Sequence, residues 1–158
     1  MKKFYLVIAM MLLSMTAFAA PKELPVQAYI GYSQTEIHAY GTEGEIKGGL
    51  VGFWMDDRAA MELGYEKTTD YDKYQVQLIG SLLHVWRQRI TWQIGADHAT
   101  TDALGFEETD TFYHYGLGYE IQPIDSLTLR AQYNRYKMDA DNGDEKPYGV
   151  TFSALFNF

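Results

Sequence analysis

The residues of this chain that could do nucleophilic or acid–base chemistry are its histidines and a few serines. They include His38, His84, His98, His114, Ser33, Ser81 and Ser153. Acyl transfer by a serine needs a histidine base beside it and an acid that orients the base. No His-x-Ser spacing occurs, and nothing in the sequence groups one of these serines with a histidine and an acid. We therefore predict no catalytic residue, and we expect His114 to fill polar space inside the fold.

Residues 139–145 have the composition of a calcium loop but not its spacing. Such a loop needs an oxygen ligand at its fifth position and a glutamate at its twelfth. Gly143 and Val150 stand at those positions. A second acidic stretch contains Asp102, Glu107, Glu108 and Asp110. Weak bridging of divalent ions stays open for both stretches, but we predict no metal site and no cofactor. The favoured interpretation is that both are solvated acidic loops.

The N-terminal residues 1–20 have the pattern of a cleaved signal peptide. Lys2 and Lys3 precede an apolar run that is too short to span a membrane as a helix, and Ala17-Phe18-Ala19 supplies a small-x-small cleavage signal. The chain has no cysteine, so neither a lipoprotein signal nor a disulfide is expected. Residues 21–158 then form the mature domain.

The mature domain is acidic and has no long apolar run. Removing the two signal lysines takes the formal net charge from −8 to −10. Such a protein is a poor candidate for binding nucleic acid, because phosphate contacts need clustered Lys and Arg. The mature protein is therefore either soluble after export or crosses a membrane as strands.

Apolar and polar residues alternate with a period of two, which indicates strands with two unlike faces. About eight such segments occur, at residues 26–34, 48–55, 59–66, 74–83, 90–97, 113–121, 127–134 and 148–158. The connections after the second, fourth and sixth segments are short. Those after the first, third, fifth and seventh are longer and polar, at residues 40–45, 67–73, 98–110 and 137–146. Short turns at one end and long loops at the other are typical of up-and-down membrane barrels.

The composition of the two faces indicates which one lies outside. One face carries Leu, Ile, Val, Ala, Phe and Tyr, and the other combines Gly, Gln, Ser and Thr with a few charges. A soluble ligand-binding barrel would turn its apolar face inward, whereas a lipid-exposed barrel turns it outward. Aromatic residues near strand ends suit interfacial girdles: Tyr40, Tyr65, Tyr71, Tyr74, Tyr133, Tyr148 and Phe158. The predicted fold is all-β, an eight-stranded antiparallel up-and-down transmembrane β-barrel.

Three stretches carry a family resemblance. Residues 52–65 (GFWMDDRAAMELGY) resemble the Gly-Tyr…Asn/Asp…Leu-Glu-x-Gly-Tyr signature of small OmpA-like outer-membrane barrels. Residues 115–120 (YGLGYE) and 127–133 (LTLRAQY) are similar to the sixth and seventh strands of that family. The resemblance covers residues 26–158, and it implies an integral location in the bacterial outer membrane.

The resemblance also implies an ionic cluster inside the barrel. Glu62, Glu120 and Arg130 match the family positions that block or gate the lumen, and by parity all three point inward. Ser81 and Gly95 stand where a well-known member has further basic residues. We therefore expect Arg130 to be the only strongly basic group among the mid-strand lumen residues. The favoured interpretation is a structural plug rather than a switchable pore.

The last strand ends on an aromatic residue and is similar to the signal read by the barrel assembly machinery. Its alternate residues are Tyr148, Val150, Phe152, Ala154, Phe156 and Phe158. The resemblance implies a non-enzymatic, monomeric envelope protein with four acidic surface loops. Its expected partners are outer-membrane lipid, lipopolysaccharide and the assembly machinery. A lipid A-modifying enzyme and an adhesin-type surface barrel remain the alternatives.

Overall fold

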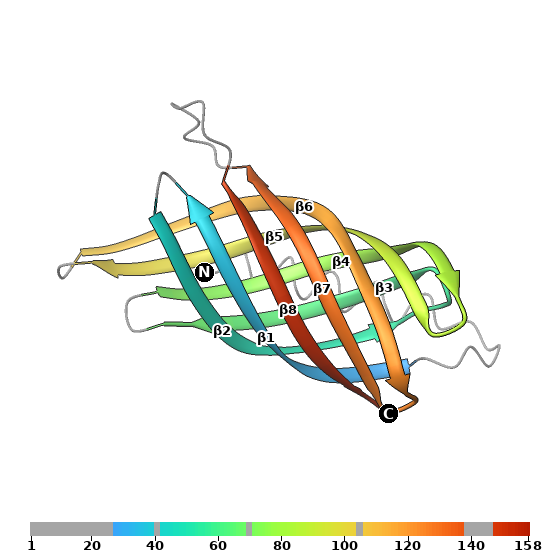
Figure 1. Cartoon of the computed structure of the whole chain (residues 1–158). Helices are drawn as coiled ribbons and strands as arrows, with labels where there is room; N and C mark the ends of the chain where they lie inside the picture. The colour runs from blue at the N-terminus through green and yellow to red at the C-terminus, as the bar shows by residue number, and fades with distance from the viewer. Residues whose placement is uncertain (1–26, 40–41, 69–70, 104–105, 138–146) are drawn as a thin grey trace, which may run out of the picture.

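The computed structural model of the chain describes residues 27–39, 42–68, 71–103, 106–137 and 147–158, and these form a closed β-barrel (Figure 1). The predicted signal peptide and residues 139–145 lie outside the described residues. The eight strands are β1 (Gln27–Ala39), β2 (Thr42–Trp54), β3 (Ala59–Lys67), β4 (Tyr71–Val85), β5 (Gln88–Ala103), β6 (Phe106–Ile124), β7 (Leu127–Lys137) and β8 (Tyr148–Asn157). No helix in the described part of the chain is long and apolar enough to cross a membrane.

Each strand pairs antiparallel with the next, and β8 closes the barrel on β1. The closing register places Tyr29 opposite Asn157 and His38 opposite Tyr148. We call the end with connections 55–58, 86–87 and 125–126 the turn end, and the opposite end the loop end. The short turn after β2 is stabilised by Asp56, whose carboxylate accepts hydrogen bonds from the backbone N–H groups of Arg58 (2.7 Å) and Ala59 (2.8 Å).

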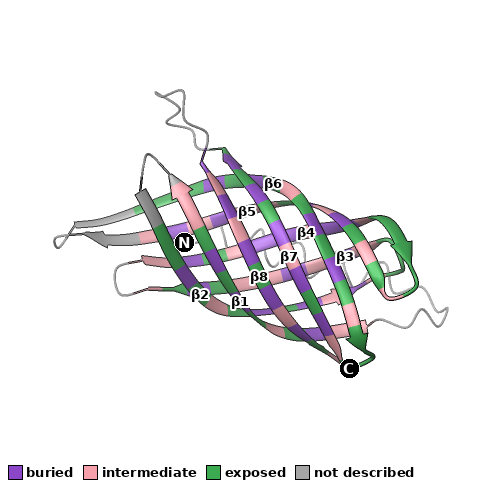
Figure 2. Cartoon of the chain, viewed as in Figure 1, coloured by how far each residue is buried: buried purple, intermediate pink, exposed green. Residues whose placement is uncertain are grey.

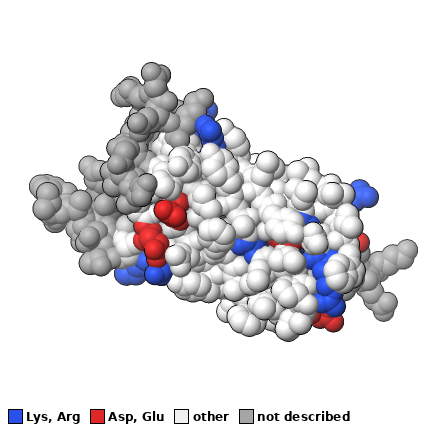
Figure 3. Space-filling view, viewed as in Figure 1, with Lys and Arg blue, Asp and Glu red and all other residues white. Residues whose placement is uncertain are grey.

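The two faces of the strands are distributed as the alternation predicts (Figure 2). Along β7, Arg130, Gln132 and Asn134 are buried, at 2%, 4% and 2% exposed, whereas Leu129 and Tyr133 are 43% and 40% exposed. A barrel with a polar interior and an apolar exterior is stable only where lipid contacts the exterior. Most of the face seen in Figure 3 is accordingly formed by uncharged residues. The alternative of a ligand-binding barrel whose apolar face turns inward is therefore wrong.

The outward residues of β8 alternate in the same way. Phe152, Phe156 and Phe158 are 60%, 57% and 76% exposed, while Thr151, Ser153 and Leu155 are buried inside. The terminal segment is therefore placed as its pattern predicts, and its reading by an assembly machinery stays a prediction. Tyr65, Tyr74, Tyr133 and Tyr148 also lie on the outer side, but Tyr71 packs inside and is not a girdle residue. Tyr40 lies outside the described residues.

The strands at the loop end are longer than predicted. The predicted loops 40–45, 67–73 and 98–110 are largely strand, because β2 begins at Thr42, β4 at Tyr71 and β6 at Phe106. These stretches were predicted as loops because their residues are polar. Strands that extend into water can carry polar side chains and keep their backbone hydrogen bonds, and threonine favours the strand conformation. In the β5–β6 hairpin, Thr100 and Thr109 pair across the strands at 3.4 Å, and His98 and Thr111 pair at 2.9 Å.

The strands also continue further into the turn end than predicted. The predicted connection 84–89 is wrong at both sides, because β4 runs to Val85 and β5 begins at Gln88. Trp86 has φ 54°, a backbone conformation that is uncommon for a residue with a side chain. The connection therefore consists of residues 86–87 only, and His84 and Arg89 face each other as paired strand residues.

Two apolar layers lie inside the barrel, one near each end. The layer at the turn end consists of Tyr29, Leu50, Trp54, Ala60, Ile79 and Leu155. The layer at the loop end consists of Ala99, Phe112 and Tyr136, with Tyr71 against them. The rest of the interior is largely polar, and it holds the charged residues described below.

Gly48 is expected to be the less replaceable of two adjacent glycines in β2. A Cβ at Gly48 would overlap the backbone of Tyr65 and Glu66, whereas a Cβ at Gly49 would meet nothing closer than the Gly31 carbonyl oxygen at 3.8 Å. Gly48→Ala should therefore lower the free energy of unfolding by about 1–3 kcal/mol, and Gly49→Ala should leave it nearly unchanged. Urea titration of the refolded protein in detergent micelles measures both. Equal midpoints would contradict the prediction.

Candidate functional site: the charged interior of the barrel

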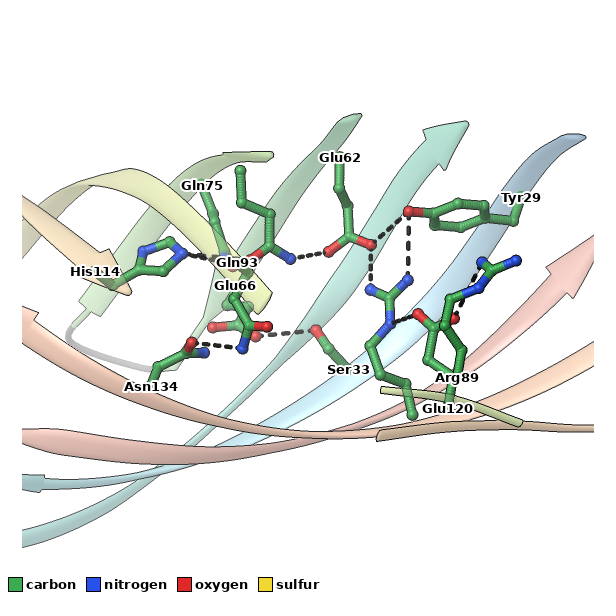
Figure 4. Close-up of polar contacts among 12 residues, drawn as sticks. Tyr29, Ser33, Glu62, Glu66, Gln75, Arg89, Gln93, His114, Glu120 and Asn134 are labelled. Carbon is green, nitrogen blue, oxygen red and sulfur yellow. Dashed lines mark hydrogen bonds and ion pairs between the residues drawn. The ribbon is translucent and has the colours of Figure 1, made fainter. Parts of the chain in front are cut away.

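The three charged residues predicted to share the lumen are in contact. Arg130 Nη1 lies 2.5 Å from Glu62 Oε2, and Arg130 Nε donates a hydrogen bond of 2.6 Å to Glu120 Oε1 (Figure 4). Glu120 faces Arg130 across the β6–β7 pair, whereas Glu62 reaches it from β3. All three are at most 4% exposed. Parity therefore placed each residue on the correct face, and the closed barrel brings the three together.

Further groups complete the hydrogen bonding of this cluster. Tyr29 donates from its hydroxyl to Glu62 Oε2 at 3.0 Å, and Gln77 donates from its amide to Glu62 Oε1. Arg89 Nη1 lies 3.6 Å from Glu120 Oε2, and its guanidinium stands 3.7 Å from the centre of the Trp54 ring. We call Tyr29, Glu62, Arg89, Glu120 and Arg130 the turn-side cluster. It contains two carboxylates and two guanidiniums, so its charges balance.

A second cluster lies nearer the loop end. Lys73 Nζ is 2.6 Å from Glu66 Oε2, and both side chains are 2% exposed. Ser33 and Thr35 each donate from their hydroxyls to Glu66 Oε1 at 2.9 Å. On the other side of the lumen, His114 Nδ1 lies 3.1 Å from Asp97 Oδ2. We call Glu66, Lys73, Asp97 and His114 the loop-side cluster.

Gln77 connects the two clusters. Its amide nitrogen donates to Glu62, and its amide oxygen lies 3.3 Å from His114 Nε2. Gln77 is itself 2% exposed. A continuous chain of polar contacts therefore runs from Arg89 through Arg130, Glu62 and Gln77 to Asp97.

Sequence reasoning missed two of the basic groups in this interior. Arg130 is not alone, because Lys73 and Arg89 also point into the lumen. Lys73 was assigned to a loop and Arg89 to a turn, since each stands next to a polar connection. The signal was present: Lys73 shares the parity of Gln75 and Gln77, and Arg89 shares that of the inward residues of β5.

The other candidate residues for chemistry are spread over the barrel. His38 stacks on Tyr148 at the loop end with ring centres 4.6 Å apart, and His84 is exposed near the turn end. His114 is the one that fills polar lumen space, and its ring contacts Asp97, Gln75 and Gln77. Among the described residues no group of three or more His, Asp or Glu side chains could hold a metal ion.

A pocket opens at the turn end and reaches the turn-side cluster. Its lining includes Gln27, Trp54, Arg89, Glu120, Gln122 and Leu155. Arg89 and Glu120 are therefore approached from that end, while Arg130 and Glu62 lie deeper. The pocket gives this side of the interior a polar entrance that stops at the ion pairs.

The comparisons with known proteins agree with the fold. No protein-family model and no curated protein sequence matches the chain. The N-terminal β-barrel domain of OprF from Pseudomonas aeruginosa matches with TM-score 0.68 at 13% identity, over 84% of this chain and 99% of that chain. The attachment invasion locus protein Ail of Yersinia pestis matches with TM-score 0.53 at 18% identity, over 84% of this chain and 97% of that chain.

A third likeness is to Neisserial surface protein A. It matches with TM-score 0.57 at 12% identity, over 84% of this chain and 97% of that chain. At these identities the likeness is one of fold. The chain has the closed eight-stranded barrel fold of small integral outer-membrane proteins, in agreement with the OmpA-like resemblance and the predicted outer-membrane location.

Proposed function

We propose that this chain, which has the fold of small integral outer-membrane β-barrels, is a non-enzymatic envelope protein with a lumen closed by its own side chains. The turn end lies in the periplasm and the loop end outside the cell, as in other barrels with short periplasmic turns. The protein contributes to envelope structure or to surface interaction through its loop end. The observation that carries this proposal is the chain of buried polar contacts from Arg89 to Asp97.

The physical argument for closure rests on the ion pairs that lie beyond the pocket at the turn end. An ion entering from the turn end would reach Arg89 and Glu120 through the pocket and then meet Arg130 held between Glu62 and Glu120. Passage would separate ion pairs that have little water around them, which costs several kcal/mol. The interior of an eight-stranded barrel is only wide enough for side chains to fill.

Planar-bilayer recording tests the closed lumen. We expect the refolded protein to give no conductance steps above those of the lipid in 1 M KCl, whereas an open porin in the same bilayer gives clear steps. Heat-modifiable gel mobility of the recovered protein checks that folded barrels were present. Regular single-channel steps from folded protein would overturn the closed-lumen proposal.

The same interior argues against the alternative of a lipid A-modifying enzyme. Such chemistry needs a nucleophile and a base at the lipid interface. His114 and Asp97, whose side chains are both 0% exposed, face the lumen, and His114 Nε2 contacts the amides of Gln75 and Gln77. Mass spectrometry of lipid A from cells with and without the protein separates the two functions. A change in acyl chains that depends on the protein would favour the enzyme.

The adhesin-type alternative concerns the loop end and is compatible with a closed lumen. Ail, one of the structures of similar fold, is named as an attachment invasion locus protein. Deleting residues 139–145 and measuring binding to host cells tests whether this chain shares such a role.

A further inference from the structure

Two cations stand side by side on the outer surface at the loop end of β7. Arg135 and Lys137 are both exposed, and they are the last two outward residues of that strand. Arg135 lies opposite Tyr115 on β6 and Tyr148 on β8, and Lys137 lies opposite Tyr113. Lys and Arg atoms are visible at the upper edge of Figure 3, on the side where β7 ends in Figure 1. We call Arg135 and Lys137 the rim cations.

Among the residues that the structure describes, the rim cations have no acidic partner, unlike the other outward lysines at this end. Lys47 pairs with Glu45 at 2.5 Å, and Lys67 pairs with Asp72 at 3.2 Å. Within the described ranges, Arg135 and Lys137 make no ion pair with any carboxylate. Two adjacent positive charges repel each other, and an anion between them would remove that repulsion.

The height of the rim cations matches the level of lipid headgroups. Counted from Leu127 at the turn end, Arg135 is eight residues along the strand, which is about 20 Å along the barrel axis at ~3.3 Å per residue and a tilt of ~40°. Lys137 stands about 5 Å higher by the same geometry. The apolar band of such barrels is ~25 Å tall. The outward residues below the rim cations on β7 are Leu129, Ala131 and Tyr133. The facing residues on β6, Tyr113 and Tyr115, are 58% and 55% exposed.

We propose that Arg135 and Lys137 bind the phosphorylated headgroup of an outer-leaflet glycolipid of the lipid A class. A phosphate monoester supplies negative charge opposite Arg135 and Lys137. The guanidinium of Arg135 can donate two parallel hydrogen bonds to the phosphate oxygens. Lys137 adds a point charge, and the tyrosines provide the interfacial platform on which the sugar rests. The proposal rests on the proposed orientation, with the loop end outside the cell. It does not depend on closure of the lumen, which the conductance recording tests separately.

Native mass spectrometry of the refolded protein in detergent micelles tests this site. The probes are bisphosphorylated lipid A, the same lipid A with its phosphates removed, and phosphatidylglycerol. Wild type should retain bisphosphorylated lipid A about tenfold better than either of the other lipids, and Arg135→Gln/Lys137→Gln should lose about tenfold of that retention. A large excess of inorganic phosphate should not displace the lipid, because the acyl chains hold it on the barrel.

The matched control is Lys47→Gln/Lys67→Gln, which also removes two outward lysines at the loop end, and its lipid retention should equal that of wild type. Equal retention by wild type and by Arg135→Gln/Lys137→Gln would overturn the site. An equal loss in the control would overturn it too, because the effect would then follow net charge. Equal retention of phosphatidylglycerol, or displacement by inorganic phosphate, would overturn the choice of lipid A. Heat-modifiable mobility identifies folded variants, and the single substitutions replace the double if it fails to fold.

Discussion

Replacing Arg130 with alanine is expected to lower the free energy of unfolding by about 3–5 kcal/mol. The substitution leaves the Glu62 and Glu120 carboxylates buried without their guanidinium, and an unpaired buried charge costs far more than the pair contributes. Urea titration in detergent micelles, followed by heat-modifiable gel mobility, measures the change. An unchanged urea midpoint for Arg130→Ala would contradict the account of the turn-side cluster.

Two variants show whether this loss comes from the carboxylates. Arg135→Ala removes the same residue type from the same strand at an exposed position, so its midpoint should stay close to that of wild type. The double variant Arg130→Met/Glu62→Gln removes one charge of each sign and leaves Glu120 paired with Arg89, so it should recover much of the stability. Equal losses in Arg130→Ala and the double variant would instead indicate that packing determines the effect.

Replacing Lys73 with methionine is expected to have the second-largest effect, a loss of about 3 kcal/mol. Lys73 is the cation of the loop-side cluster that Glu66 contacts at 2.6 Å, with both side chains 2% exposed. Methionine keeps most of the volume of the lysine side chain, so the loss of stability measures the effect of removing the positive charge. Urea titration of Lys73→Met, Glu66→Gln and the double variant gives a double-mutant cycle that measures the interaction between the two residues.

The matched control for Lys73 is Lys67→Met. Lys67 also pairs with a carboxylate, Asp72, but its side chain is 59% exposed, so its loss should be below about 1 kcal/mol. Adding Glu66→Gln to Lys73→Met should return part of the stability, because Glu66 then no longer stands as a buried carboxylate without its contacting cation. Similar losses for Lys73→Met and Lys67→Met would contradict the prediction.

The fold could be predicted from the sequence because apolar and polar residues alternate along each strand, and this alternation shows which face of the strand lies inside the barrel. Glu62, Glu120 and Arg130 were placed inside by parity, and the structure has them there. Their pairing across the lumen is a different matter. Glu62 and Arg130 are 68 residues apart and meet because of the stagger of the closed barrel. No local pattern encodes that stagger, so the family resemblance was needed to group them.

The parts that could not be predicted lie where strand and loop compositions overlap. Lys73, Arg89 and the β5–β6 hairpin stand in polar stretches, and polarity was taken to mark a loop. In a membrane barrel the strands leave the lipid before they end, so their outer residues become polar while the ladder continues. Parity continues through such stretches, and it would have placed Lys73 and Arg89 inside.

The closure of β8 on β1 has a consequence for how the chain folds. Tyr29 pairs with Asn157, so β1 has no second neighbour until β8 has left the ribosome. Contacts between the two ends of a chain are long-range and form slowly. Until they form, the open sheet keeps two edge strands whose backbone N–H and C=O groups have no partner. A chain of this kind cannot close its barrel while it is being synthesised, and its apolar outer face is stable only in contact with lipid. It must reach its membrane unfolded, and it must be kept from aggregating on the way.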